Sequence, residues 1–219
     1  MTQENILLIS DPKVLAVPIE DNGDKLVNLK DLKELLIDDR KSKSSRSFSY
    51  LRNSVTLRLI SAQRGLPEGI HFLIIEGHRP LSLQKEYFDG YSTELKKLHP
   101  EWLAEKIYQE ASKYVAPPAI NPPHSTGGAV DLTLVDETGK ELDMGTRVNA
   151  DPEESQNACF TSASNISEKA KQNRNILITA LSQNGFINYP TEWWHWSYGD
   201  RYWAYHAKEP FAIFGSVER

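Results

Sequence analysis

The sequence predicts an α+β fold, in which a central antiparallel sheet is flanked by helices. Several segments repeat apolar residues at helical spacing, whereas two short apolar segments are typical of buried strands. These elements do not alternate regularly, as they would in a parallel βαβ protein. The chain has 219 residues, of which 39% are hydrophobic and 25% are charged, as expected for a globular protein. We therefore expect one domain over residues 1–219, and the pattern leaves open whether residues 1–45 form a less regular N-terminal arm.

Helical periodicity is strongest in residues 47–64, where Leu51, Val55 and Leu59 recur along one face. Breaks at Gly and Pro, and a candidate N-cap at Ser82, mark the bounds of other helices. The predicted helices are 28–38, 47–64, 82–98, 101–114 and 168–181.

Two strands are predicted ahead of the C-terminal part. Residues 71–76 contain a short apolar run, and residues 129–135 alternate apolar side chains with Asp131 and Thr133. The alternation predicts that Asp131 lies on the polar face of its strand. We expect the functional site to lie on this sheet.

Two further segments have distinct patterns. Residues 136–163 are polar and lack periodicity, and a segment of this length usually indicates a functional loop or lid. Residues 186–205 are rich in aromatic side chains and predict two strands joined by a turn at Gly199-Asp200.

Charge and composition restrict the partners. The net charge of −5 argues against nucleic acid or an anionic membrane as the main partner. The only basic run, residues 40–46, alternates with serines and predicts a solvated loop. No window reaches the ~18 apolar residues of a membrane span, and the N-terminal segment lacks the layout of a secretory signal. With Cys159 as the single cysteine, we expect a cytoplasmic protein without disulfides. The oligomeric state is not indicated.

Candidate catalytic residues gather in three stretches: 76–80, 124–131 and 192–195. A catalytic zinc needs about three protein ligands and an open position for water. His124 and Asp131 lie at the two ends of a turn in which glycines let the backbone double back. His195 adds a third ligand from another element. Glu192 is close enough in sequence to His195 to activate water without binding the metal.

Glu192 and His195 face opposite sides of a regular strand, so their convergence requires a bend, which we expect near Trp193. Arg79 follows a buried strand and precedes Pro80, so its guanidinium is a candidate for stabilising an oxyanion. The alternative for Arg79 is a structural pair with a carboxylate. His78 is not expected to be a ligand, because the site already has its set.

At these residues the chain resembles the D-alanyl-D-alanine dipeptidases of the vancomycin-resistance type. They belong to a zinc peptidase group that also holds D,D-carboxypeptidases, lysostaphin-type endopeptidases and the hedgehog signalling domain. The similarity covers roughly residues 70–205. Beyond the ligands it includes Asp131-Leu132-Thr133-Leu134, Met144-Gly145-Thr146-Arg147, Gln172-Asn173-Arg174 and Gly185-Phe186.

The resemblance implies a hedgehog/D,D-peptidase-like fold and one Zn²⁺ per chain. It implies that His124, Asp131 and His195 bind this ion, that Glu192 is the general base and acid, and that Arg79 stabilises the transition state. It also implies a small enclosed cavity whose substrate is a dipeptide.

Two positions depart from the family pattern. Pro122 stands where the group usually has a serine, so a hydroxyl contact to the substrate carboxylate is either absent or supplied by Ser125. Asn149 stands where the resistance enzyme has an aspartate that receives the substrate ammonium, and Asp151 is a candidate replacement. Trp194 is expected to help wall the site.

Three functions therefore stay open. The first is a zinc dipeptidase for D-Ala-D-Ala or a closely related dipeptide. The second is a D,D-carboxypeptidase or murein endopeptidase on the same scaffold. The third is a non-catalytic zinc-binding interaction module, which is disfavoured because a purely structural zinc is usually closed by four ligands.

Overall fold

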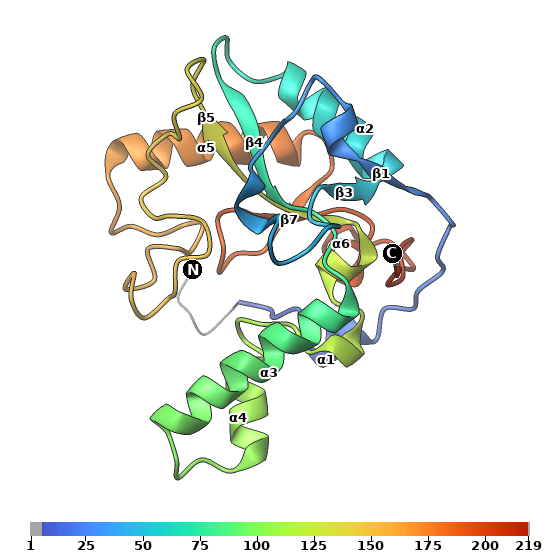
Figure 1. Cartoon of the computed structure of the whole chain (residues 1–219), viewed down its shortest axis with the longest axis vertical. Coiled ribbons are helices and arrows are strands. Elements are labelled where there is room, and N and C mark those ends of the chain that lie inside the picture. Colours follow the sequence, from blue (N-terminus) through green and yellow to red (C-terminus); the bar gives the residue numbers. More distant parts are fainter. Residues whose placement is uncertain (1–5, 219) are drawn as a thin grey trace.

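A computed structural model describes residues 6–218 and contains a five-stranded sheet of order β2-β4-β5-β7-β6 (Figure 1). Its neighbouring strands are antiparallel, except that β2 pairs with β4 in parallel. The predicted α+β class is confirmed, with one parallel edge added to the antiparallel sheet. The strands are β2 (Leu36–Ile37), β4 (His71–Glu76), β5 (Ala129–Val135), β6 (Ile187–Asn188) and β7 (His195–Ser197). A separate two-stranded sheet pairs β1 (Leu26–Asn28) with β3 (Tyr50–Arg52).

The central strand β5 is buried along its whole length. Both of its faces are covered, so the polar face predicted from the alternation is not exposed to solvent: Asp131 is 2% exposed and Thr133 is 1% exposed. A buried carboxylate is costly unless it is paired or binds a metal. Asp131 therefore needs partners inside the protein.

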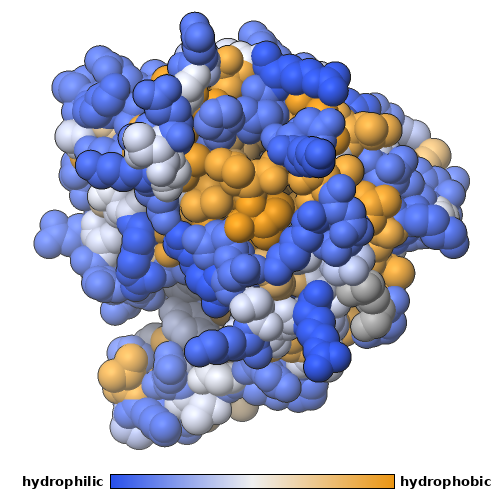
Figure 2. Space-filling view, turned by 45° about the horizontal axis from the view of Figure 1, so that its top comes forward, coloured by the Kyte–Doolittle hydropathy of each residue, from blue (hydrophilic) through white to orange (hydrophobic). Residues whose placement is uncertain are grey.

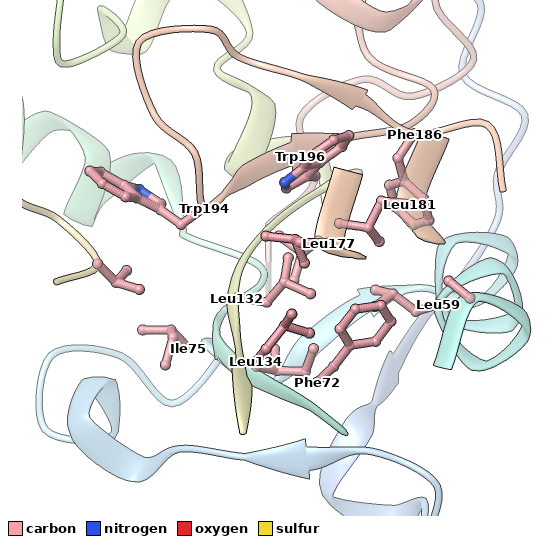
Figure 3. Close-up of a cluster of buried hydrophobic side chains, with 14 of the residues drawn as sticks. Leu59, Phe72, Ile75, Leu132, Leu134, Leu177, Leu181, Phe186, Trp194 and Trp196 are labelled. Carbon is pink, nitrogen blue, oxygen red and sulfur yellow. The ribbon is translucent and has the colours of Figure 1, made fainter. Parts of the chain in front are cut away.

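One side of the sheet is covered by α2 (Asn53–Arg64) and α5 (Glu168–Ser182). Figure 3 shows Leu177 and Leu181 of α5 directed toward the side chains of β5, with Leu59 of α2 beside them. The burial of such side chains contributes roughly 1.5–3 kcal/mol each. This packing fixes the sheet that carries the site.

Away from the sheet, α3 (Leu81–Leu98) and α4 (Ala104–Ala111) form a helical hairpin (Figure 1). The rings of Phe88 and Tyr108 meet edge to face at 5.3 Å between centroids and hold the two helices together. The first turns of α3 leave the sheet immediately after Pro80, so this helix begins beside the predicted site. Short helices α1 (Pro12–Leu15) and α6 (Arg201–Ala207) lie near each other.

Two sequence-based predictions of secondary structure were wrong. Residues 28–38 form a short turn, η2 (Leu29–Asp31), and the edge strand β2 instead of a helix. The Asn28 side chain accepts a hydrogen bond from the amide of Lys30, and such local bonds compete with helix formation. Residues 201–207 form α6 instead of a strand, because Asp200 caps the helix by accepting from the amide of Trp203 at 2.7 Å.

Two other helices are shorter than predicted. Within residues 47–64 the helix α2 begins only at Asn53, since Tyr50–Arg52 pair as β3. Within residues 101–114 the helix is limited to α4.

Residues 136–163 contain neither helix nor strand apart from an isolated bridge between Val135 and Glu141. The predicted long loop is therefore present. Arg174 of α5 holds it by donating from Nε to the carbonyl of Met144 at 2.8 Å and from Nη2 to the carbonyl of Ala158 at 2.7 Å. The loop is thereby anchored at two points.

The face in Figure 2 is largely hydrophilic, with a broad apolar area near its centre and further apolar areas toward its right side and lower left. No helix within residues 6–218 is both long and apolar enough to cross a membrane.

Candidate active site

Three acidic and imidazole side chains occupy matching positions on neighbouring strands. Asp131 of β5 is paired with Glu76 of β4 on one side and with His195 of β7 on the other. Directly opposed residues of antiparallel strands point to the same face of the sheet. The register therefore places these side chains in a row across β4, β5 and β7.

The fourth residue, His124, comes from η5 (Pro123–Thr126), the turn that leads into β5. Gly127 ends this turn with φ of 72°, a left-handed conformation that favours glycine. A Cβ on Gly128 would lie 2.5 Å from the carbonyl oxygen of Tyr198. Both glycines thus let the chain double back and bring His124 toward Asp131, as the sequence predicted.

The three predicted ligands converge. His124 Nε2 lies 3.3 Å from Asp131 Oδ1 and 3.1 Å from His195 Nδ1, and His195 Nδ1 lies 3.1 Å from Asp131 Oδ1. His124 and His195 are each 5% exposed. This buried group could hold a metal ion.

Hydrogen bonding fixes the proton position on His124. Its Nδ1 is 2.8 Å from the carbonyl oxygen of Gly77, and a carbonyl can only accept, so Nδ1 carries the hydrogen. The lone pair of the neutral ring is then on Nε2, which faces Asp131 and His195. Metal-binding imidazoles are commonly oriented by such a contact. Burial opposes ionisation of Asp131, but the adjacent His124 and His195 hold its pKa well below the usual value.

Glu192 reaches the same place through a turn. Residues 190–194 are not strand, and the amide of His195 donates to the carbonyl of Glu192 at 3.2 Å. The bend that the sequence predicted near Trp193 is therefore present. Glu192 Oε2 lies 3.9 Å from His195 Nδ1. Desolvation raises the pKa of Glu192 to about 7 against the opposing field of His195, and the negative charge of Asp131 adds to the rise.

Arg79 has the structural pairing that the sequence left as an alternative. Its Nε and Nη2 each donate to Glu76 at 2.8 Å, and its Nη1 donates to Gln84 Oε1 at 2.9 Å. Burial opposes ionisation of Glu76, but Arg79 lowers the pKa of this carboxyl to about 2. The guanidinium retains N–H donors that these bonds do not use. Pairing with Glu76 therefore orients Arg79 and leaves some of its N–H donors available to a ligand.

All five residues predicted to bind metal or catalyse line one cavity of about 430 Å³. They are Arg79, His124, Asp131, Glu192 and His195. Side chains of α3 form part of its wall. The arrangement combines a buried group that could hold a metal ion, an adjacent carboxylic acid with a raised pKa and a fixed cation.

The four predicted substrate-binding residues lie in different places. Ser125 is fully buried, and its hydroxyl donates to the carbonyl of Arg79 at 2.8 Å, so it does not line the cavity. Asn149 lines the cavity from the long loop. Asp151 and Trp194 line an adjoining pocket of about 230 Å³ that shares Asn149 and Glu192 with the main cavity.

Sequence reasoning missed Lys41, which lines the cavity although the basic run 40–46 predicted a solvated loop. No local signal distinguishes it from its exposed neighbour Lys43. Its partners come from β4 and α3, which lie far along the chain. Only these tertiary contacts place Lys41, and not Lys43, in the cavity wall.

Known proteins are similar to this chain over most of its length. The model of the D-ala-D-ala dipeptidase family matches residues 43–213. A D-alanyl-D-alanine dipeptidase of Synechocystis sp. is 31% identical to this chain, over 93% of the chain and 96% of the relative. A D-alanyl-D-alanine dipeptidase of Escherichia coli is 34% identical over 52% of the chain and 54% of the relative.

These matches define the chain as a peptidase, a hydrolase of peptide bonds. It belongs to the D-ala-D-ala dipeptidase family, which confirms the resemblance found in the sequence. The solved structure of the LdcB LD-carboxypeptidase covers 95% of this chain and 89% of its own, with a TM-score of 0.50 and 17% identity. This likeness concerns the fold alone and confirms the predicted hedgehog/D,D-peptidase-like class.

Proposed function

We propose that this protein is a zinc dipeptidase that cleaves D-Ala-D-Ala or a closely related dipeptide into free amino acids. The observation that carries the proposal is the convergence of His124 Nε2, Asp131 Oδ1 and His195 Nδ1 within one cavity that also contains Glu192. Around a tetrahedral zinc with bonds of ~2.0–2.1 Å, ligand atoms lie roughly 3.4 Å apart. The separations of 3.1 to 3.3 Å fit this geometry.

When bound, zinc would polarise the substrate carbonyl and lower the pKa of water toward ~7. Glu192 takes a proton from the attacking water and passes it to the leaving amine. The water oxygen bonds to the carbonyl carbon, and the C–N bond breaks to give two amino acids. A carboxylate beside the metal-binding group can accept the proton from water and return it to the amine.

Arg79 supplies positive charge beside the carbonyl on which negative charge develops. Its orientation by Glu76 supports this role, because a donor that is already fixed loses little freedom during the reaction. In the adjoining pocket we propose Asp151 as the acceptor for the substrate ammonium, with Asn149 beside it and Trp194 as a wall. Ser125 is proposed only to position Arg79. A cytoplasmic location stays a prediction.

The direct test is hydrolysis by the zinc-loaded protein of a panel containing D,D, L,D and L,L dipeptides and a pentapeptide that ends in D-Ala-D-Ala. We expect release of free alanine from the D,D dipeptide and little cleavage of the pentapeptide. Faster cleavage of the pentapeptide would support a D,D-carboxypeptidase instead. If zinc binds and no substrate of the panel is cleaved, the result would support the alternative of a non-catalytic zinc-binding interaction module.

Replacing Arg79 with Lys should lower kcat by about 10²- to 10³-fold with a smaller change in KM, because lysine keeps the charge but not the paired geometry. Steady-state kinetics on the D,D dipeptide measure both constants. Arg64→Lys, at an exposed position on α2, is the matched control. An unchanged kcat in Arg79→Lys would restrict Arg79 to its structural pair with Glu76.

A further inference from the structure

Lys41 lies beside a carboxylate that another residue already neutralises. It ends the short turn η3 (Asp39–Lys41), and its Nζ lies 3.2 Å from Glu76 Oε2. The same carboxylate is held at both oxygens by Arg79. Two cations therefore contact one carboxylate, so the cluster of Lys41, Arg79 and Glu76 has more positive than negative charge.

The surplus charge faces the catalytic cavity. The side chain of Lys41 is 19% exposed and lines the same cavity as the metal-binding group. The ring of Tyr87 on α3 lies beside both cations. Its centroid is 5.5 Å from Lys41 Nζ and 5.0 Å from the guanidinium carbon of Arg79. A partly desolvated cation at this position attracts an anion more strongly than one at the open surface.

The adjoining pocket carries the carboxylate of Asp151. Tyr91 lies one helical turn after Tyr87 on α3 and shares the adjoining pocket with Asp151. Desolvation raises the pKa of Tyr91 to about 12, and the negative charge of Asp151 adds to the rise. Because one turn of helix advances about 5.4 Å, Tyr91 lies about this far along α3 from Tyr87.

The paired positions on β4, β5 and β7 show on which side of Asp131 Lys41 lies. Glu76, which Lys41 contacts, lies on the β4 side of Asp131, whereas His195 and the Glu192 turn lie on its β7 side. An extended dipeptide spans about 7 Å. A dipeptide lying along this row would direct one terminus toward the β4 side, where Lys41 contacts Glu76.

We propose that Lys41 binds the C-terminal carboxylate of the substrate and so selects dipeptides with a free acid at that end. The inference rests on the proposed function and adds the direction in which the substrate lies. Lys41 precedes residues 43–213, which the family model matches.

The test compares wild type, Lys41→Met and Lys41→Arg on D-Ala-D-Ala and on its C-terminal amide. A charge-assisted hydrogen bond contributes enough to change affinity by about 10- to 100-fold. We expect Lys41→Met to lower kcat/KM for the free acid by this factor, chiefly through KM, and to change that for the amide less than about 3-fold. Lys41→Arg should recover part of the loss. Lys43→Met, in the same loop and exposed, should behave as wild type.

Equal losses on acid and amide would overturn the inference, because they would indicate that Lys41 only supports Glu76 and Arg79. No loss on either would overturn it as well. Calorimetric titration of the dipeptide and its amide into zinc-loaded Glu192→Gln, with and without Lys41→Met, measures binding without turnover. If wild type cleaves nothing but Lys41→Met still weakens binding of the acid alone, the proposed reaction fails and the carboxylate site stands. If neither ligand binds, the carboxylate site fails too.

Discussion

Glu192→Gln is expected to lower kcat by about 10²- to 10⁴-fold while the protein keeps its zinc. Glutamine has nearly the shape of glutamate and fits the same turn before β7, but it cannot accept a proton from water. Glu192 Oε2 lies 3.9 Å from His195 Nδ1, outside the shorter contacts that join the ligand atoms. The metal-binding group should therefore remain intact.

Kinetics on the D,D dipeptide and metal analysis of the purified variant decide this prediction together. Glu137→Gln, in the exposed part of the long loop, is the matched control and should retain wild-type kinetics. Full activity in Glu192→Gln would show that Glu192 is not the general base. Loss of zinc together with activity would instead make Glu192 a ligand.

Asp131→Asn is expected to weaken zinc binding by more than about 100-fold and to abolish turnover with it. Asp131 contacts both imidazoles and is 2% exposed, so no solvent or surface group can replace its charge. A ligand that binds only the folded protein raises its melting temperature. Added zinc should therefore raise Tm in the wild type and much less in Asp131→Asn.

Differential scanning calorimetry with and without zinc measures this difference. Thr133→Val is the matched control, because Thr133 lies on the same strand, is 1% exposed and is not one of the three residues whose ligand atoms converge. It should keep the zinc-dependent rise in Tm. The same rise in Asp131→Asn as in the wild type would exclude Asp131 from the ligand set.

The residues that converge at the site could be identified from sequence because local chemistry restricts them. His124 and Asp131 are joined by a turn that needs glycine, and the strand around Asp131 was predicted with its observed bounds. The pairing of Asp131 with both Glu76 and His195 was not predictable, since strand register depends on partners far along the chain.

Other predictions failed for similar physical reasons. The aromatic spacing in residues 201–207 suits a strand as well as a helix, and the cap supplied by Asp200 decides for the helix. For Arg79 the sequence offered a catalytic role or a structural pair as alternatives. Its bonds to Glu76 and its place in the cavity make the two compatible. Lys41 was missed because only tertiary packing separates it from the other cations of its loop.

The loops that carry His124 and Arg79 are joined by direct contacts. The amide of Arg79 donates to the carbonyl of His124 at 3.2 Å, Ser125 Oγ donates to the carbonyl of Arg79 at 2.8 Å, and His124 Nδ1 donates to Gly77 at 2.8 Å. Substitutions in the two loops should therefore show epistasis, since residues within one hydrogen-bond network do not contribute additively. Adaptation of this enzyme to new substrates is then easier through the long loop, which lies outside this network, than through the residues next to the metal-binding group.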